Sequence, residues 1–298
     1  MYQTKLAPEI MAMRPGEDYG EIEPFMDTNE AFHFLAEAIY SRAKGKQTSK
    51  VLSEILDREK CEINCSPIKA AERLDEADPD HVMSNDIFWF LEKAYYDAAN
   101  CIDPKYWYSL ARLYYYDRYG HVNFEKATAY LKTAVEKIDG RAEVLLGRCY
   151  LYGEGVERDY EKAFHLLLKG ALLDYSGEAV YLLGDCYMNG WHVQQDKPQA
   201  YNMYLRAYRL LDKAEDLLVA DSLVRIADYK LNEIKTYDQL TDALYCYQQA
   251  ELRYYDQRKH HYRGAVEGLL LSRQGQVMVR DCIDELEKKM EDPFYMED

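Results

Sequence analysis

Two nine-residue stretches decide the fold: Leu145-Leu146-Gly147-Arg148-Cys149-Tyr150-Leu151-Tyr152-Gly153 and Leu182-Leu183-Gly184-Asp185-Cys186-Tyr187-Met188-Asn189-Gly190. They agree at Leu-Leu-Gly, Cys, Tyr and the last Gly, and they lie 37 residues apart (145 to 182). A shorter copy, Leu110–Tyr114, lies 36 residues upstream (111 to 147), with Ala111 in place of the glycine. Self-similarity at such a period is typical of repeat proteins. We therefore expect tandem repeats.

Small residues also recur in the second half of each unit. Sixteen residues after Ala111, Gly147 and Gly184 stand Ala127, Ala163 and Ala200, and seven residues later stand Ala134, Gly170 and Ala207. A weaker unit keeps the same spacing at Ala227, Ala243 and Ala250. Two helices approach closely only where a side chain is minimal. The pattern predicts that each unit is a pair of closely packed helices.

Capping and turn residues separate the two helices of a unit. Asn123, Asp159 and Asp196 each stand four residues before the alanine of the second half, where a side chain can accept hydrogen bonds from the first helical turn. The clearest turn is Gly153-Glu154-Gly155-Val156, in which glycine supplies backbone angles that other residues resist. Each unit is therefore predicted to be helix–turn–helix, and such units stack into a solenoid.

These residues resemble the Sel-1-like repeat, a relative of the tetratricopeptide repeat. The shared pattern is Leu-Gly-x-x-Tyr-x-x-Gly-x-Gly-Val followed by Asp-x-x-Lys-Ala, complete between Ala142 and about Ser176. The next unit has His192 where the second turn glycine is expected. The resemblance covers roughly residues 85 to 256 and implies an all-α fold, a right-handed α–α superhelix.

The regions outside the repeats divide the rest of the chain. Residues 1–27 are predicted to form an acidic, largely irregular arm, either a solvated tail or a segment that packs on the solenoid or mimics a ligand. Residues 28–84 are predicted to be an irregular helical cap, followed by the solenoid at 85–256. Residues 257–298 are predicted to be C-terminal capping helices, with a dimerising helix as the alternative.

Composition narrows the class of protein. The net charge of −16 argues against a nucleic-acid partner, because an acidic protein repels phosphates. Seven sparsely spaced cysteines do not suggest a disulfide framework, and neither a signal peptide nor a membrane-length apolar run is visible. We therefore expect a cytoplasmic protein without membrane partners, monomeric or homodimeric.

The search for chemistry gives no catalytic, metal or cofactor site. Cys61, Cys65 and His81 do not have zinc-site spacing, and an idle thiol is the simpler interpretation. Gly153 and Gly155 follow a helix and lack the lysine of a phosphate-binding loop. We expect a protein that is not an enzyme and takes no cofactor.

The resemblance implies a bacterial-type adaptor that holds a partner protein or peptide in a groove lined by the first helices. On the first helix of each unit, the residues at positions −3, +1 and +5 from the small residue form one stripe, which is expected to line the groove. Val144, Val224 and Asn232 belong to this stripe. Tyrosine and arginine often anchor interfaces, and an acidic or apolar segment is expected over Arg112 and Arg148. The alternatives are tyrosines that only pack between units, and a regulatory subunit or effector whose N-terminal region adds an activity. The predicted groove residues are Tyr108, Arg112, Tyr115, Tyr116, Arg148, Tyr152, Tyr181, Asp185, Asn189 and Asp228.

Overall fold

The computed structural model describes residues 84–116, 121–137, 139–173, 176–213, 217–233, 236–259 and 264–291, together with residues 68, 71, 72 and 75. These residues form ten α-helices, and no strand occurs among them, so the predicted all-α fold is confirmed. The predicted arm at 1–27 and nearly all of the cap at 28–84 lie outside the described residues, and so do Cys61, Cys65 and His81.

The chain divides into two compact units, Met1–Asn123 and Phe124–Asp298. The boundary falls inside the first predicted repeat, between its two helices. The first unit contains α5 (Ser84–Cys101) and α6 (Tyr106–Tyr115). The second unit contains α7 (Phe124–Glu136), α8 (Gly140–Tyr152), α9 (Tyr160–Leu173), α10 (Gly177–Asn189), α11 (Lys197–Lys213), α12 (Val219–Glu233), α13 (Tyr237–Lys259) and α14 (Ala265–Glu291).

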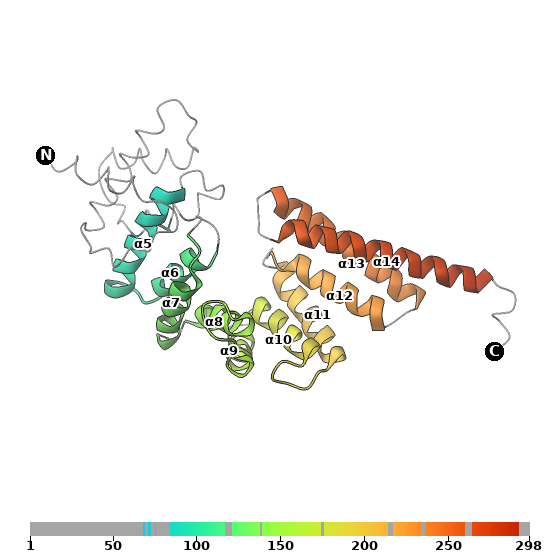
Figure 1. Cartoon of the computed structure of the whole chain (residues 1–298), viewed down its shortest axis with the longest axis horizontal. Coiled ribbons are helices and arrows are strands. Elements are labelled where there is room, and N and C mark those ends of the chain that lie inside the picture. The colour runs from blue at the N-terminus through green and yellow to red at the C-terminus, as the bar shows by residue number, and fades with distance from the viewer. Residues whose placement is uncertain are drawn as a thin grey trace, which may run out of the picture. The chain divides into compact units, whose positions relative to one another are not determined.

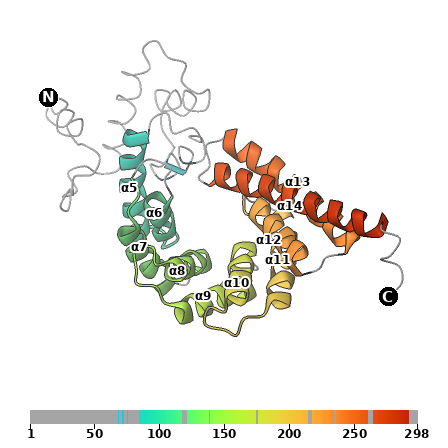
Figure 2. The same ribbon diagram turned by 45° about the vertical axis from the view of Figure 1, so that its right-hand side comes forward.

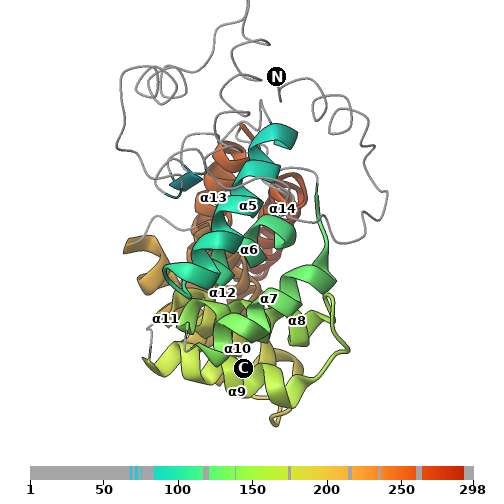
Figure 3. The same cartoon turned by 90° about the vertical axis from the view of Figure 1, so that its left-hand side faces the viewer.

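In the first unit, α5 and α6 pack side by side through aromatic residues (Figure 3). The rings of Phe88 and Tyr114 meet edge to face at 5.3 Å, and those of Tyr95 and Tyr106 stack at 5.7 Å. The Tyr106 hydroxyl donates to Glu72 at 2.8 Å. Aromatic pairs therefore make up much of the packing in this unit.

In the second unit, α8/α9, α10/α11 and α12/α13 are antiparallel hairpins that follow one another (Figure 1). Figure 2 shows the long helices α13 and α14 lying side by side. The small residues predicted to let paired helices approach are buried throughout this unit, which confirms the packing prediction: Ala127, Ala134, Gly147, Ala163, Gly170, Gly184, Ala200, Ala207, Ala227, Ala243 and Ala250.

The predicted caps and turns recur with nearly the same geometry. Asp159 Oδ1 accepts from the Lys162 N–H at 3.0 Å, and Asp196 Oδ1 accepts from the Gln199 N–H at 2.9 Å. Gly153 and Gly155 adopt φ of +76° and +68°. In the next unit Gly190 has φ +71° and His192, in the second glycine position, has φ +66°. The turn therefore keeps its left-handed geometry where the sequence has no glycine.

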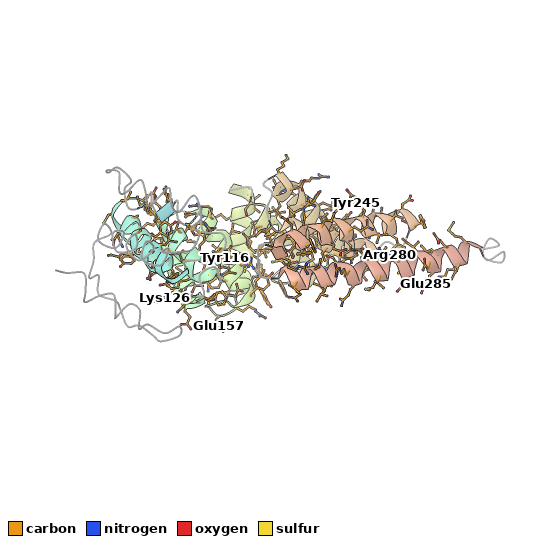
Figure 4. All side chains as sticks on the ribbon, turned by 90° about the horizontal axis from the view of Figure 1, so that it is seen from above. Tyr116, Lys126, Glu157, Tyr245, Arg280 and Glu285 are labelled. Carbon is orange, nitrogen blue, oxygen red and sulfur yellow. The ribbon has the colours of Figure 1, made fainter. Side chains whose placement is uncertain are left out.

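Glycines of α14 meet tyrosines of α13. A Cβ added at Gly268 would lie 2.3 Å from the Tyr254 ring, and one added at Gly275 would lie 2.3 Å from the Tyr247 ring. Both pairs of residues are seven apart, so two turns of each helix interlock. One face of helix α14 therefore packs against α13. In Figure 4 the two helices can be located by the labels Tyr245 on α13 and Arg280 and Glu285 on α14.

Candidate functional site

A pocket of about 390 Å³ lies in the second unit between α10, α12 and α14, with α13 tyrosines at its base. Helices α10 and α12 are the first helices of successive hairpins, and α14 follows them in the same order. The side chains of α14 that line it are Glu267, Leu271, Gln274 and Met278. The other lining residues are Tyr181, Asp221, Val224, Arg225, Asp228, Leu231, Asn232, Tyr247, Tyr254, Gly264, Gly268 and Gly275.

Hydrogen bonds from tyrosine to aspartate connect the two helices of the hairpins α10/α11 and α12/α13. Tyr204 donates to Asp185 Oδ1 at 2.7 Å, and Tyr247 donates to Asp228 Oδ1; both pairs are 19 residues apart. The same bond occurs at equivalent positions because the helix pair itself is repeated. Asp185 and Asp228 each follow the small residue of the first helix, and both face the second helix of their hairpin. These bonds hold carboxylates on the pocket side of the hairpins.

A second set of bonds crosses between hairpins. Tyr152 of α8 donates to Asp185 Oδ2 of α10 at 3.4 Å. Within the hairpin α12/α13, Tyr254 also donates to Asp221 Oδ1, at 2.7 Å. Arg225 of α12 lies 3.3 Å from Asp185 Oδ1 and donates to the Tyr181 hydroxyl at 3.3 Å. The network fixes α8, α10 and α12 in register through polar side chains.

Burial changes the acid–base properties of these groups. Desolvation raises the pKa of Asp185, Asp221 and Asp228 above the usual aspartate range, partly opposed by Arg225 and the tyrosine hydroxyls. Burial, followed by the nearby Asp185, raises the pKa of Tyr204. The tyrosine hydroxyls therefore remain protonated donors at neutral pH.

Several predicted groove residues lie at this pocket. Tyr181 and Asp228 line it, as do Val224 and Asn232 of the predicted stripe. Asp185 is only 2% exposed, so it supports the pocket from beneath its surface. Asn189 is exposed and its side-chain amide donates to the backbone of its own helix at Asp185.

Other predicted residues connect successive repeats. Arg148 of α8 pairs with Glu178 of α10 at 3.3 Å, and Tyr152 bonds to Asp185. Val144, by contrast, is 4% exposed and packs within its own hairpin, where a Cβ at Gly170 of α9 would meet it at 2.4 Å. At Arg148 and Tyr152 the stripe holds neighbouring hairpins together, which agrees with the packing alternative for Tyr152.

The remaining predicted residues belong to the first unit. Arg112 and Tyr116 of this group are exposed, whereas Tyr115 is 5% exposed and Tyr108 is partly buried. Tyr115 therefore offers little surface to a partner. A groove that joins these residues to Arg148 and the second unit stays a prediction.

The sequence pattern did not include the pocket residues of α13 and α14. Glu267, Leu271 and Met278 of α14 lie outside the repeating pattern of small residues. Helix α14 has no second helix of its own, and its glycines pack against tyrosine rings of α13. The signal that could have located them is the matched seven-residue spacing of Gly268 and Gly275 with Tyr247 and Tyr254. That spacing becomes informative only when the contacts of Gly268 with Tyr254 and of Gly275 with Tyr247 are known.

Groups for metal or redox chemistry do not gather in the part of the chain that the structure describes. No cluster of three or more His, Cys, Asp or Glu side chains suited to a metal ion occurs there. The five described cysteines are free thiols, and burial raises the pKa of both Cys149 and Cys186 to about 12. None of the described helices combines the length and apolar character that crossing a bilayer requires.

Comparison with known proteins supports the assignment of the repeats. The pattern of the Sel1 repeat matches residues 140–175 and 177–210. The alginate biosynthesis protein AlgK of Pseudomonas aeruginosa is 44% identical over 68 residues, which is 23% of this chain and 14% of AlgK. The match thus spans a small part of that relative's length.

Two solved structures are similar to this chain. The antigen c5321, a protective antigen present in uropathogenic Escherichia coli strains and displaying an SLR fold, is 18% identical with a TM-score of 0.51, over 88% of this chain and 56% of that one. A Sel1 repeat protein from Oxalobacter formigenes is 19% identical with a TM-score of 0.47, over 87% of this chain and 100% of that one. At this identity the likeness to c5321 concerns the fold.

Proposed function

Because the chain belongs to the Sel-1-like repeat family, with two matched Sel1 repeats at residues 140–210, we propose that it is a non-catalytic scaffold that binds a partner protein or peptide on its first helices. Sel1 repeats generally mediate protein–protein interaction. The observation that carries the proposal is the pocket that α10, α12 and α14 line together. A surface shared by successive first helices suits an extended segment of another protein.

The pocket has the composition of a binding surface. Leu271 and Met278 are 50% and 53% exposed although both are apolar, and tyrosine rings lie beside them. Interface cores are enriched in aromatic residues and methionine, and exposed apolar groups beside polar ones are typical of contact surfaces. These features support binding of a macromolecule at this place.

The proposal is tested by selecting a random twelve-residue peptide display library on the full chain and measuring the binders by fluorescence anisotropy. Leu271→Asp places a charge in the pocket and is expected to weaken binding at least about tenfold, or about 1.4 kcal/mol. Leu252→Asp is the matched control, because Leu252 is 64% exposed on α13 and does not line the pocket. Binders that respond equally to both substitutions, or no binders at all, would contradict the proposal.

A further inference from the structure

We infer that the pocket between α10, α12 and α14 binds a basic, partly apolar segment of the partner protein. This inference rests on the proposed function and adds the chemistry of the partner. It depends on three features: an acidic wall, an apolar wall, and tyrosine rings between them.

The acidic wall lies on α12. Asp221 and Asp228 stand seven residues apart, so both face the same side of the helix. A tyrosine hydroxyl bonds to Oδ1 of each, and Oδ2 of each has no hydrogen-bond partner among the described residues. Glu267 adds a third carboxylate from α14 and is exposed. Three carboxyl side chains therefore line the pocket.

The apolar wall lies on α14. Leu271 and Met278 share one side of that helix, seven residues apart, and line the same pocket as Leu231 of α12. Tyr181, Tyr247 and Tyr254 contribute rings. A lysine or arginine side chain fits both walls, since its stem covers apolar surface while its cation meets carboxylates or the face of a ring.

Among the described lining residues, the one cation does not reverse this charge. Arg225 is held on the α10 side by Asp185 and the Tyr181 hydroxyl, each at 3.3 Å. Asp221, Asp228 and Glu267 line the pocket with Arg225, which is paired with Asp185 behind the lining. Arg148 of α8 also acts on Asp221, and it is paired with Glu178. An acidic segment would meet this excess of like charge, so electrostatic complementarity favours a basic occupant.

The inference is tested with the peptides selected above, their composition and their affinities. We expect pocket-dependent binders to be enriched in Arg or Lys next to Leu, Ile, Val or Met. The double variant Asp221→Asn with Asp228→Asn keeps an oxygen for each tyrosine hydroxyl but removes two charges. It is expected to weaken these peptides about tenfold, and replacing their basic residues with Gln should weaken them similarly.

The matched control is Glu125→Gln with Glu161→Gln, which removes two charges from exposed positions on α7 and α9 outside the pocket. An equal loss in this control would show general charge attraction and overturn the inference. Pocket-dependent binders without basic enrichment would overturn it while leaving the proposed function in place. Self-association of the full chain that Leu271→Asp abolishes would assign the pocket to a second copy and also overturn it. Circular dichroism melting of each variant verifies that it is folded.

Discussion

The hairpins α8/α9 and α10/α11 and the C-terminal helices α12–α14 belong to one unit but are stabilised differently. The two hairpins carry the full turn and cap signals and match the Sel1 repeat, and their turns have left-handed residues at both expected positions. The C-terminal helices lack those turn glycines and provide most of the pocket lining. Helix α14 packs its glycines on tyrosines of α13, a kind of contact that Gly184 and Tyr204 also make within α10/α11. We infer that the residues of the repeat pattern stabilise the stacked hairpins. The pocket lies mainly on helices whose sequence departs from that pattern.

The largest expected change in the free energy of unfolding comes from a comparison of two turn glycines, Gly155 and Gly153. A Cβ at Gly155 would lie 2.1 Å from the Phe124 carbonyl oxygen, whereas one at Gly153 would have nothing closer than 3.6 Å. Both have positive φ, so both variants carry backbone strain, but only Gly155→Ala adds a clash with backbone. We expect Gly155→Ala to cost about 3–4 kcal/mol and Gly153→Ala about 1 kcal/mol. Urea unfolding measures both, and equal costs would contradict the close approach of this turn to α7.

A smaller effect compares helical glycines in the two regions. At Gly275 a Cβ would lie 2.3 Å from the buried Tyr247 ring, whereas at Gly147 its nearest contact is the Leu167 side chain at 3.0 Å. We expect Gly275→Ala to cost about 1–3 kcal/mol through overpacking. Gly147→Ala should be nearly neutral, because alanine gains up to about 1 kcal/mol in helix propensity against a tight contact. Thermal unfolding of both variants measures this, and a larger loss at Gly147 would reverse the comparison.

The buried carboxyls give the C-terminal helices a distinct pH dependence. Burial raises the folded-state pKa of Asp221 and Asp228, so the folded state binds more protons than the unfolded chain between the two pKa values. Their contribution to stability is therefore lost as pH rises through the folded-state pKa. We expect the stability of the wild type to fall more, as pH rises above about 4, than that of Asp221→Asn with Asp228→Asn.

Urea unfolding midpoints across this pH range measure the difference. The exposed pair Glu125→Gln with Glu161→Gln should keep the slope of the wild type. A parallel shift of all three curves would contradict the assignment of this slope to the pocket carboxyls.

The smallest expected effect concerns the second turn of the regular repeats. His192 holds φ +66°, which is unfavourable for a side chain with a Cβ, and its ring lies 5.4 Å from Phe164. His192→Gly should relieve the backbone strain, lose the ring contact and gain flexibility in the unfolded chain, for a net stabilisation of about 0.5 kcal/mol. A thermal shift assay detects the direction. Clear destabilisation would show that the histidine ring contributes more than its backbone strain costs.

The sequence determined the local features of this protein. Recurrent small residues predicted the buried contacts of Gly147 and Gly184, and Asp159 and Asp196 predicted the helix starts. Such features depend on residues close in sequence and on a fixed period, so one chain is enough to find them. Tyr181 and Asp228 of the predicted stripe line the pocket, and their role in binding a partner stays a prediction.

Only the tertiary structure decided which of these residues face a cavity and which join hairpins. Arg148 and Tyr152 fit the same stripe as Asp228, yet they bond to the neighbouring helix α10. The contribution of α14 was not visible in the repeat register, because its rotation is set by the interlocking of Gly268 and Gly275 with tyrosines of α13. Long-range side-chain packing sets the facing of a helix, and no local periodicity of the sequence specifies it.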